Sequence, residues 1–221
     1  QDARLFVRSL DELGATQLVA AVSARTPVFS PDDQWVAFGV DDDSTLRKVP
    51  ASGGPAQVLA RTNGYATGGL DWSDSGIYFS AGALLGEGLS RVAATGGTPE
   101  RVTILDRERG ENAHVFPQVL PGGKSLLFTI LSEKGPDESQ VVVQSLPTGA
   151  RRVLLQGVTR ARYVSSGHLL YTQAAALLAA PFDLARLAIT GTPAVVVDRI
   201  STAIDAGGGR FAVAEEGTLV Y

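Results

Sequence analysis

Ten polar residues lie in the short segments that precede the extended stretches of this sequence, and their side chains are of the kinds that bind ligands. Four of the ten are arginines, although the chain as a whole carries a net charge of −4. A guanidinium presents a planar fork of N–H donors that fits a carboxylate or a phosphate. If these segments meet in space, they form a site for a small ligand, with an anion as one candidate. The residues are Arg25, Thr26, Thr67, Glu111, Asn112, His114, Arg160, Arg162, Asp205 and Arg210.

The same arginines also have a structural interpretation, in which each pairs with Glu111, Asp205 or Asp71 or extends into water. Asp71 occupies a position that is apolar in the equivalent stretches, so its carboxylate must be hydrogen-bonded or its pKa must rise. We favour hydrogen bonds from the backbone of the adjoining turn over an acid that lines a channel. His114 is placed to titrate near neutral pH.

Sequence motifs of known catalytic and metal chemistry are absent. The chain has no G-x-S-x-G, H-E-x-x-H or G-x-G-x-x-G signature and no cysteine. The acidic run Asp41–Ser44 lacks the alternating ligand spacing of a calcium loop, which favours a solvated loop. Gly123–Ser125 resembles the end of a phosphate-binding loop, but Gln118 stands where that motif needs its first glycine. We therefore expect neither catalysis nor a metal or cofactor in this chain.

The elements that would position these residues are repeated along the chain. Residues 27–38 read as an apolar strand, a Ser-Pro-Asp-Asp turn and a second strand that ends in an aromatic residue, and 45–59 continue as a hairpin with a Gly-Gly turn. Four further copies follow, of which the last is only half complete. The residues that close the second strands are Phe38, Phe79, Phe128, Tyr171 and Tyr221, which are 41, 49, 43 and 50 residues apart. Four-stranded propeller blades repeat about every 40–50 residues.

The repeats predict an all-β fold, a five-bladed β-propeller of four-stranded antiparallel blades in a single domain, 1–221. The ring is closed by pairing of the N- and C-terminal strands, which removes free sheet edges. The segments that carry the ten polar residues then become connectors that meet at one mouth of the central channel. The blades are 24–60, 66–105, 115–156 and 160–200, and the closing blade combines 210–221 with 1–22.

Some local features carry expectations of their own. Trp35 and Trp72 are expected to pack between blades, and His168 is expected to be structural. The segment Pro181–Leu187 is expected to form one helical turn. Ile200–Arg210 contains three successive glycines and is expected to be the most mobile loop.

Composition excludes several classes of partner. A pI near 5.2 argues against nonspecific nucleic-acid binding, which needs a broad basic surface. No stretch approaches the roughly 18 apolar residues of a membrane span, so we expect no membrane insertion by this segment. Methionine is absent as well, and we expect the chain to be a processed protein or part of a longer one.

The phrases FSPDDQWVAF and LSRVAATGGTPERVT resemble the repeats of TolB-type propellers, whose pattern is F-S-P-D-G, a strand, and L-x-x-V-x-x-x-G-G-x-P. Asp33 departs from that pattern, which has glycine there. VFPQVLPGGKSLLFT and PFDLARLAITGTPAVVV resemble more specifically the extracytoplasmic C-terminal propeller of bacterial transmembrane serine/threonine protein kinases. The resemblance covers nearly the whole chain. It implies a sensor or interaction domain outside the cytoplasm, with the kinase and the membrane span N-terminal to it.

Three functional hypotheses follow, in this order. The first is a noncatalytic recognition domain that binds a small ligand or a protein at the channel mouth. The second is a hydrolase of the five-bladed glycosidase type, which needs carboxylates about 5–10 Å apart in the channel and could use only Asp71, Glu111 and Asp205. The third is a structural propeller that docks a protein.

Overall fold

The computed structural model describes residues 4–9, 11–19, 23–62, 68–80, 86–201, 209–214 and 217–221. These residues form antiparallel β-strands and two short 3-10 turns, at Arg107–Arg109 and Pro136–Glu138. The predicted all-β class is therefore confirmed. No helix in the described part of the chain is long and apolar enough to cross a membrane.

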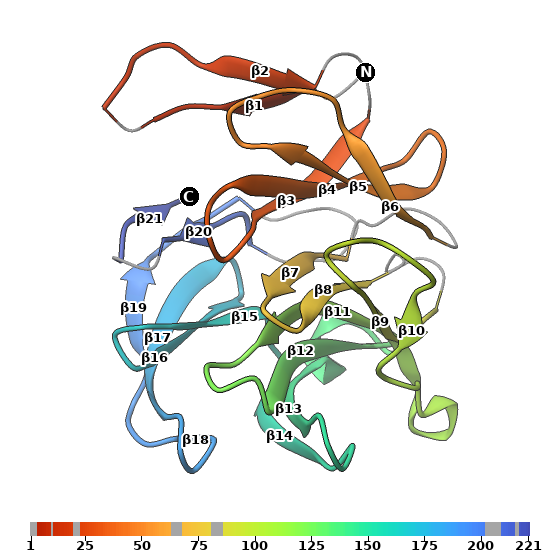
Figure 1. The fold of residues 1–221 in the computed structure, drawn as a ribbon. Helices are drawn as coiled ribbons and strands as arrows, with labels where there is room; N and C mark the ends of the chain where they lie inside the picture. The colour runs from red at the N-terminus through yellow and green to blue at the C-terminus, as the bar shows by residue number, and fades with distance from the viewer. Residues whose placement is uncertain are drawn as a thin grey trace.

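Three four-stranded antiparallel sheets follow one another in chain order, and each coincides with a predicted repeat (Figure 1). The first contains β3 (Ala24–Phe29), β4 (Trp35–Val40), β5 (Thr45–Pro50) and β6 (Gln57–Arg61). The second contains β7 (Leu70–Ser73), β8 (Gly76–Ser80), β9 (Leu89–Val92) and β10 (Glu100–Arg101). The third contains β11 (Glu111–Val119), β12 (Ser125–Ser132), β13 (Gln140–Ser145) and β14 (Arg151–Gln156).

The fourth sheet has a fifth, very short strand. It contains β15 (Thr159–Val164), β16 (His168–Gln173), β17 (Ala176–Asp183), β18 (Ala188–Ile189) and β19 (Ala194–Val197). The helical turn predicted for Pro181–Leu187 is wrong, because β17 continues to Asp183 and turns back into β18 as a hairpin. Phe182 pairs with Ile189 there and is buried against the third sheet, which holds this segment extended.

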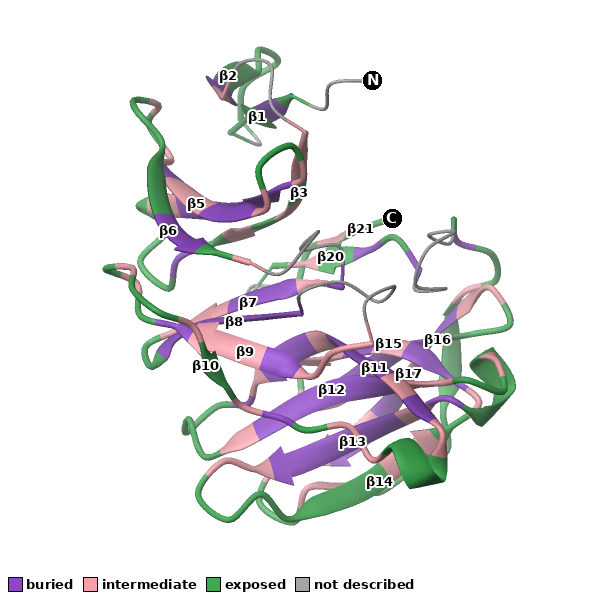
Figure 2. Ribbon diagram, turned by 90° about the vertical axis from the view of Figure 1, so that its right-hand side faces the viewer, coloured by how far each residue is buried: buried purple, intermediate pink, exposed green. Residues whose placement is uncertain are grey.

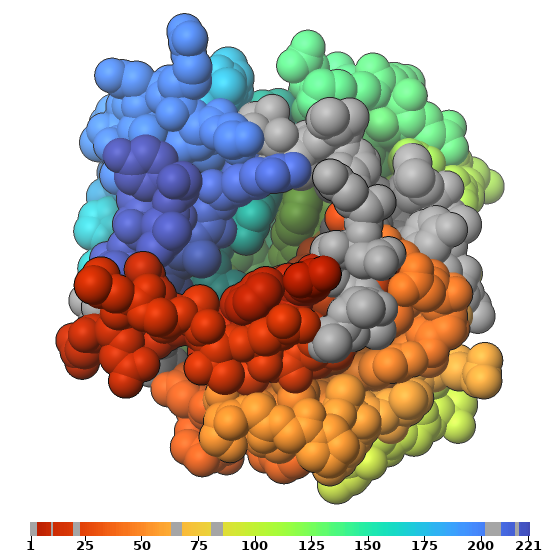
Figure 3. Space-filling model, turned by 90° about the horizontal axis from the view of Figure 1, so that it is seen from above, coloured from red at the N-terminus to blue at the C-terminus, as the bar shows by residue number. Residues whose placement is uncertain are grey.

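The two ends of the chain form separate two-stranded sheets. They are β1 (Leu5–Val7) with β2 (Thr16–Val19), and β20 (Ala212–Val213) with β21 (Leu219–Val220). Across the described ranges no strand ladder joins the two hairpins, so the predicted pairing of the chain ends is not among the observed ladders. The first hairpin packs on the first sheet through Leu5 and Leu18. A space-filling view shows it (red) beside that sheet (orange), with a hollow next to it (Figure 3).

The sheets are arranged around a central space with β3, β7, β11, β15 and β20 as their innermost strands (Figure 1). Burial is highest in the middle strands: every residue of β8 is buried, whereas the inner strand β3 has no buried residue and the outer strand β14 begins with three exposed residues. Figure 2 shows this gradient as a change from purple on β8, β12 and β13 to green on β10 and β14. The repeats therefore bury their middle strands and leave outer strands in water.

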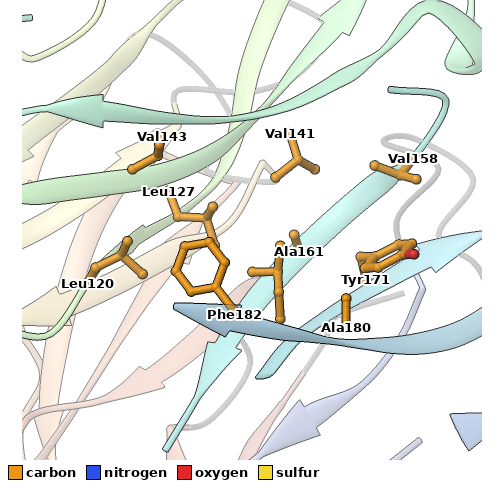
Figure 4. Close-up of a cluster of buried hydrophobic side chains, with 10 residues drawn as sticks. Leu120, Leu127, Val141, Val143, Val158, Ala161, Tyr171, Ala180 and Phe182 are labelled. Carbon is orange, nitrogen blue, oxygen red and sulfur yellow. The ribbon is translucent and has the colours of Figure 1, made fainter. Parts of the chain in front are cut away.

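Apolar side chains fill the space between neighbouring sheets. Leu127 and Val141 of the third sheet pack against Ala161 and Phe182 of the fourth (Figure 4). Comparable clusters join the first sheet to the second and the second to the third. The repeated aromatics Phe38, Phe79, Phe128 and Tyr171 are all buried, whereas Tyr221 is 69 % exposed.

Substitution of a buried repeat aromatic should cost much of the stability. Phe38 is 0 % exposed, so Phe38→Ala should lower the free energy of unfolding by about 3–5 kcal/mol through lost burial and a residual cavity. Urea unfolding followed by circular dichroism measures this. Phe29 of the same sheet is 47 % exposed, and Phe29→Ala is the matched control with an expected loss below about 1 kcal/mol. Equal losses in both variants would contradict the packing described here.

Candidate functional site

The sequence predicts the site at the end of the channel where connectors lead into the inner strands. We call this the connector end, and we call the opposite end, where each inner strand turns into the next strand, the turn end. Thr67 and Asp205 lie outside the described residues. Arg210 is exposed and Asn112 is half-buried. Arg25 donates its Nε hydrogen to Asp41 Oδ2 at 2.7 Å, within its own sheet.

The other carboxylates of the acidic run Asp41–Ser44 also accept hydrogen bonds from nearby residues. Asp42 accepts hydrogen bonds from the backbone and side chain of Ser23, and Asp43 accepts from Thr45. The described ranges contain no group of three or more acidic or histidine side chains placed to hold a metal ion.

A backbone kink recurs at the connector end. The ladders of β3, β11 and β15 each shift register by a bulge. Thr26, Phe116 and Arg160 adopt φ values of 45°, 55° and 44° at these shifts, and Gly69, just before β7, has φ 98°. Positive φ is costly for a residue with a Cβ, and bulges re-aim neighbouring side chains. Two predicted site residues, Thr26 and Arg160, therefore owe their direction to these kinks.

Arg160 is a structural clamp. Its guanidinium lies 5.6 Å from the ring centre of Phe116 and 4.7 Å from that of Phe211. It donates hydrogen bonds to the carbonyl oxygens of Gly209 and Phe211 at 2.7 and 2.8 Å. Burial lowers its pKa to about 10, which leaves it charged at neutral pH. Arg160 thus fastens the C-terminal segment to β15.

Glu111 and His114 belong to β11 and not to a connector. His114 is 0 % exposed, and its Nε2 lies 2.9 Å from Glu111 Oε2. Its Nδ1 lies 2.7 Å from the hydroxyl of Thr103, which itself accepts the Leu89 N–H at 2.7 Å. Glu111 also accepts hydrogen bonds from Arg151. Because the Glu111 carboxylate only accepts, we place the hydrogen of the neutral His114 ring on Nε2, so that Nδ1 accepts from the Thr103 hydroxyl.

The prediction that His114 titrates near neutral pH does not agree with its buried position. Burial lowers the pKa of His114 to about 4, although the Glu111 carboxylate opposes the shift, so the ring is neutral at pH 7. The contacts follow the order of a catalytic triad, with Thr103 at the position of the nucleophile, His114 at that of the base and Glu111 at that of the acid that orients it. Thr103 is only 2 % exposed, however, so no substrate reaches its hydroxyl. The network therefore joins the second sheet to the third.

A cavity of about 870 Å³ lies at the turn end of the channel. Every innermost strand contributes to its wall, either directly or through the turn that follows it. Of the ten predicted site residues, Arg162 alone lines it within the described ranges. The wall consists of Pro31, residues 71–75, residues 118–123, residues 162–165 and residues 213–214.

Asp71 is the buried acid of this cavity, with 6 % of its surface exposed. Its Oδ2 accepts the Val119 N–H at 2.8 Å, and its Oδ1 lies 3.9 Å from Arg162 Nη1. Burial raises the pKa of Asp71, and the Arg162 charge and the Val119 hydrogen bond oppose that rise. The favoured expectation of a hydrogen bond from the adjoining turn is wrong, because the donor belongs to the next sheet. The Arg162 contact agrees with the structural interpretation of the arginines.

Sequence reasoning missed most of the wall. Trp72 and Asp74 lie at the strand–turn junction of the second repeat, and Ser165 lies at that of the fourth. In the sequence these turns indicate only where each repeat lies, not that their side chains line a cavity. The one available signal was Asp71, the single acid among the equivalent inner positions. Of the carboxylates expected for a hydrolase, Asp71 lines the cavity, Glu111 is held in the His114 network and Asp205 lies outside the described residues.

Comparisons with solved structures identify the fold. The chain superimposes on a protein of the nidogen/laminin complex with a TM-score of 0.66 at 14% identity, covering 83% of this chain and 68% of that one. For TolB from Acinetobacter baumannii the TM-score is 0.61 at 13% identity, covering 82% and 46%. For regucalcin, a calcium-binding protein from Agrobacterium tumefaciens, it is 0.61 at 18% identity, covering 89% and 65%. The chain thus spans less than half the length of that TolB.

These similarities establish that the chain folds as a β-propeller. No protein-family model matches the sequence, and no curated protein matches it either. Identities below 20% in these three structures support the architecture and carry no information about activity.

The buried histidine should make stability depend on pH. Between pH 6.5 and about 4 the unfolded chain binds a proton at His114 that the folded chain does not, so stability falls as pH falls through this window. The shift corresponds to about 3 kcal/mol at most. His114→Gln should remove this part of the pH dependence in urea unfolding at pH 7 and pH 4. His168→Gln is the matched control, because His168 lies half-buried beside Ser166.

Proposed function

We propose that this chain is a noncatalytic recognition domain that binds a small polar ligand in the cavity at the turn end of its channel. The observation that carries the proposal is a single cavity of about 870 Å³, to which all five innermost strands or their turns contribute. Ligand pockets of small molecules have volumes of about 300–1,000 Å³ and a few convergent polar groups. Here Asp71 and Arg162 are those groups.

The charges of the wall favour a neutral ligand over an anion. Two carboxylates, Asp71 and Asp74, line the cavity with one guanidinium, that of Arg162. An anion would approach Arg162 against two like charges, and this repulsion is strongest beside the buried Asp71. Of the other predicted arginines, Arg25 and Arg160 already bind Asp41 and backbone carbonyls.

The hydrolase hypothesis has less support. Glycoside hydrolysis needs two carboxyl groups that face one substrate. Glu111 already accepts hydrogen bonds from the Asp106 backbone and from Arg151 and lies beside His114. Because these partners already use the Glu111 carboxylate, we infer that it helps to hold the second and third sheets together.

The finer architecture and the setting of the domain are part of the proposal. A five-bladed ring in one domain, closed by the two terminal hairpins, accounts for the five contributions to one cavity wall. The resemblance to extracytoplasmic kinase propellers supports a sensor outside the cytoplasm. In such a receptor, ligand binding would have to favour one arrangement of the parent protein over another.

Removal of residues 211–221 should destabilise the ring strongly. Phe211 is buried against Leu170 and Leu177, and its backbone carbonyl binds Arg160. The deletion should therefore lower the melting temperature by more than about 5 °C, since loss of one buried phenylalanine costs about 3 kcal/mol or more. Tyr221→Ala, which changes an exposed residue, is the control. A deletion variant with the same melting temperature as the full chain would contradict a closed ring.

A compound panel tests recognition itself. Differential scanning fluorimetry with neutral, cationic and anionic small molecules should find compounds that raise the melting temperature of the full chain. Arg162→Ala should abolish these rises, because it removes the guanidinium of the cavity, and Arg101→Ala on the exposed strand β10 should not. A panel in which no compound raises the melting temperature would contradict small-ligand recognition and favour protein docking.

A further inference from the structure

The polar wall of the cavity contains groups whose hydrogen bonds are already made. The Gln118 amide donates to the Tyr163 carbonyl at 3.0 Å and accepts the Tyr163 N–H at 2.7 Å. Ser73 and Ser75 bond to each other at 2.9 Å. These contacts hold the groups in place as part of the wall.

Two groups of the wall can still form hydrogen bonds with a ligand. Asp71 uses Oδ2 for the Val119 N–H, which leaves Oδ1 as an acceptor. Within the described ranges the Arg162 guanidinium makes no hydrogen bond, and its closest partner is this Oδ1 at 3.9 Å. That separation is too long for a direct hydrogen bond. A single ligand oxygen placed about 2.8 Å from each atom could instead bond to both.

The pairing of a free acceptor with a free donor selects the ligand by its chemistry. An ammonium group only donates and cannot accept from Arg162, whereas a carboxylate only accepts and cannot donate to Asp71. A phosphate, like a carboxylate, would bring negative charge beside Asp71. A hydroxyl both donates and accepts. It can bridge the two groups without adding a charge to a buried site.

A second acceptor on the same wall distinguishes hydroxyl compounds from amides. Asp74 lines the cavity, and its carboxylate accepts no hydrogen bond within the described ranges. A ligand with hydroxyls on successive carbons can donate to both carboxylates and accept from Arg162, whereas one amide offers its donors from a single nitrogen. Trp72 adds aromatic surface for the carbon skeleton of such a ligand.

We propose that the cavity binds a neutral polyhydroxy compound of the sugar or cyclitol kind, one hydroxyl of which bridges Asp71 Oδ1 and Arg162. This inference rests on the proposed recognition function and names its ligand class. It assigns Asp71 as the acceptor and Arg162 as the donor, with Asp74 as a further acceptor at the rim.

The experiment is isothermal titration calorimetry of the full chain with three arms of probes. The hydroxyl arm is glucose and myo-inositol, the amide arm is acetamide and N-acetylglycinamide, and the anion arm is succinate and inorganic phosphate. Calorimetry is needed because sugars raise melting temperatures of all proteins through exclusion from the surface. A Trp35→Phe background adds a second readout, since Trp72 is then the only tryptophan.

Two variants remove the proposed contacts, and two control for charge. Asp71→Asn keeps an oxygen for the Val119 N–H but loses the carboxylate acceptor, and Arg162→Met keeps the stem but loses the donors. Each should weaken binding of the hydroxyl arm by about tenfold or more, the loss expected for a hydrogen bond to a charged group. Asp198→Asn and Arg101→Met change exposed residues elsewhere and should bind with the affinity of the unmodified chain. Far-UV circular dichroism confirms that each variant is folded.

The outcomes separate the ligand class from the function. Binding of glucose or myo-inositol that depends on both Asp71 and Arg162 supports the inference. Binding that survives both variants overturns the assignment of these residues. Binding confined to the amide or anion arm overturns the ligand class and leaves recognition standing. An absence of binding in every arm overturns the inference, and the result of the compound panel then decides the proposed function.

Discussion

In the described part of the chain no strand ladder joins the innermost strands of neighbouring sheets, and the structure depends on side chains that join them across the channel wall. Asp71 of β7 accepts the Val119 N–H of β11. Gln118 of β11 makes two hydrogen bonds with the Tyr163 backbone of β15. Arg160 of β15 binds the Phe211 carbonyl that precedes β20. Each of these contacts pairs a partly buried backbone group, for which an unmade hydrogen bond is costly.

These polar joints and the apolar clusters perform different tasks. The clusters between sheets, such as Leu127 with Phe182, supply most of the burial but specify position only through shape. A hydrogen bond between named atoms fixes the register of one inner strand against the next. The same joints carry the polar atoms that face the channel, so the groups that hold the ring are also those that define its interior. Asp71 shows both roles, with one oxygen bound to Val119 and the other directed at Arg162.

The repeats were predictable because each one contains the same short-range signals. An alternating strand, a turn rich in Ser, Pro, Asp and Gly and a closing aromatic recur, and Phe38, Phe79 and Phe128 are buried as that pattern requires. The candidate site was predictable only in part, because it depends on long-range contacts. The seating of Arg160 between two rings requires knowledge of Phe211, which lies 51 positions away. Glu111 and His114 read as a polar connector, but β11 begins earlier than the sequence pattern indicates and buries them.

Kinks of positive φ recur at Thr26, Phe116 and Arg160 on three inner strands, and Gly69 has a positive φ just before a fourth. The aperture at that end of the propeller is thereby framed by main chain whose conformation is a property of the repeat. Side chains at neighbouring positions can be exchanged while the frame keeps its width. The side chains of this rim can therefore change without a change in its width. Related chains could differ in what passes the rim and still have a rim of the same width.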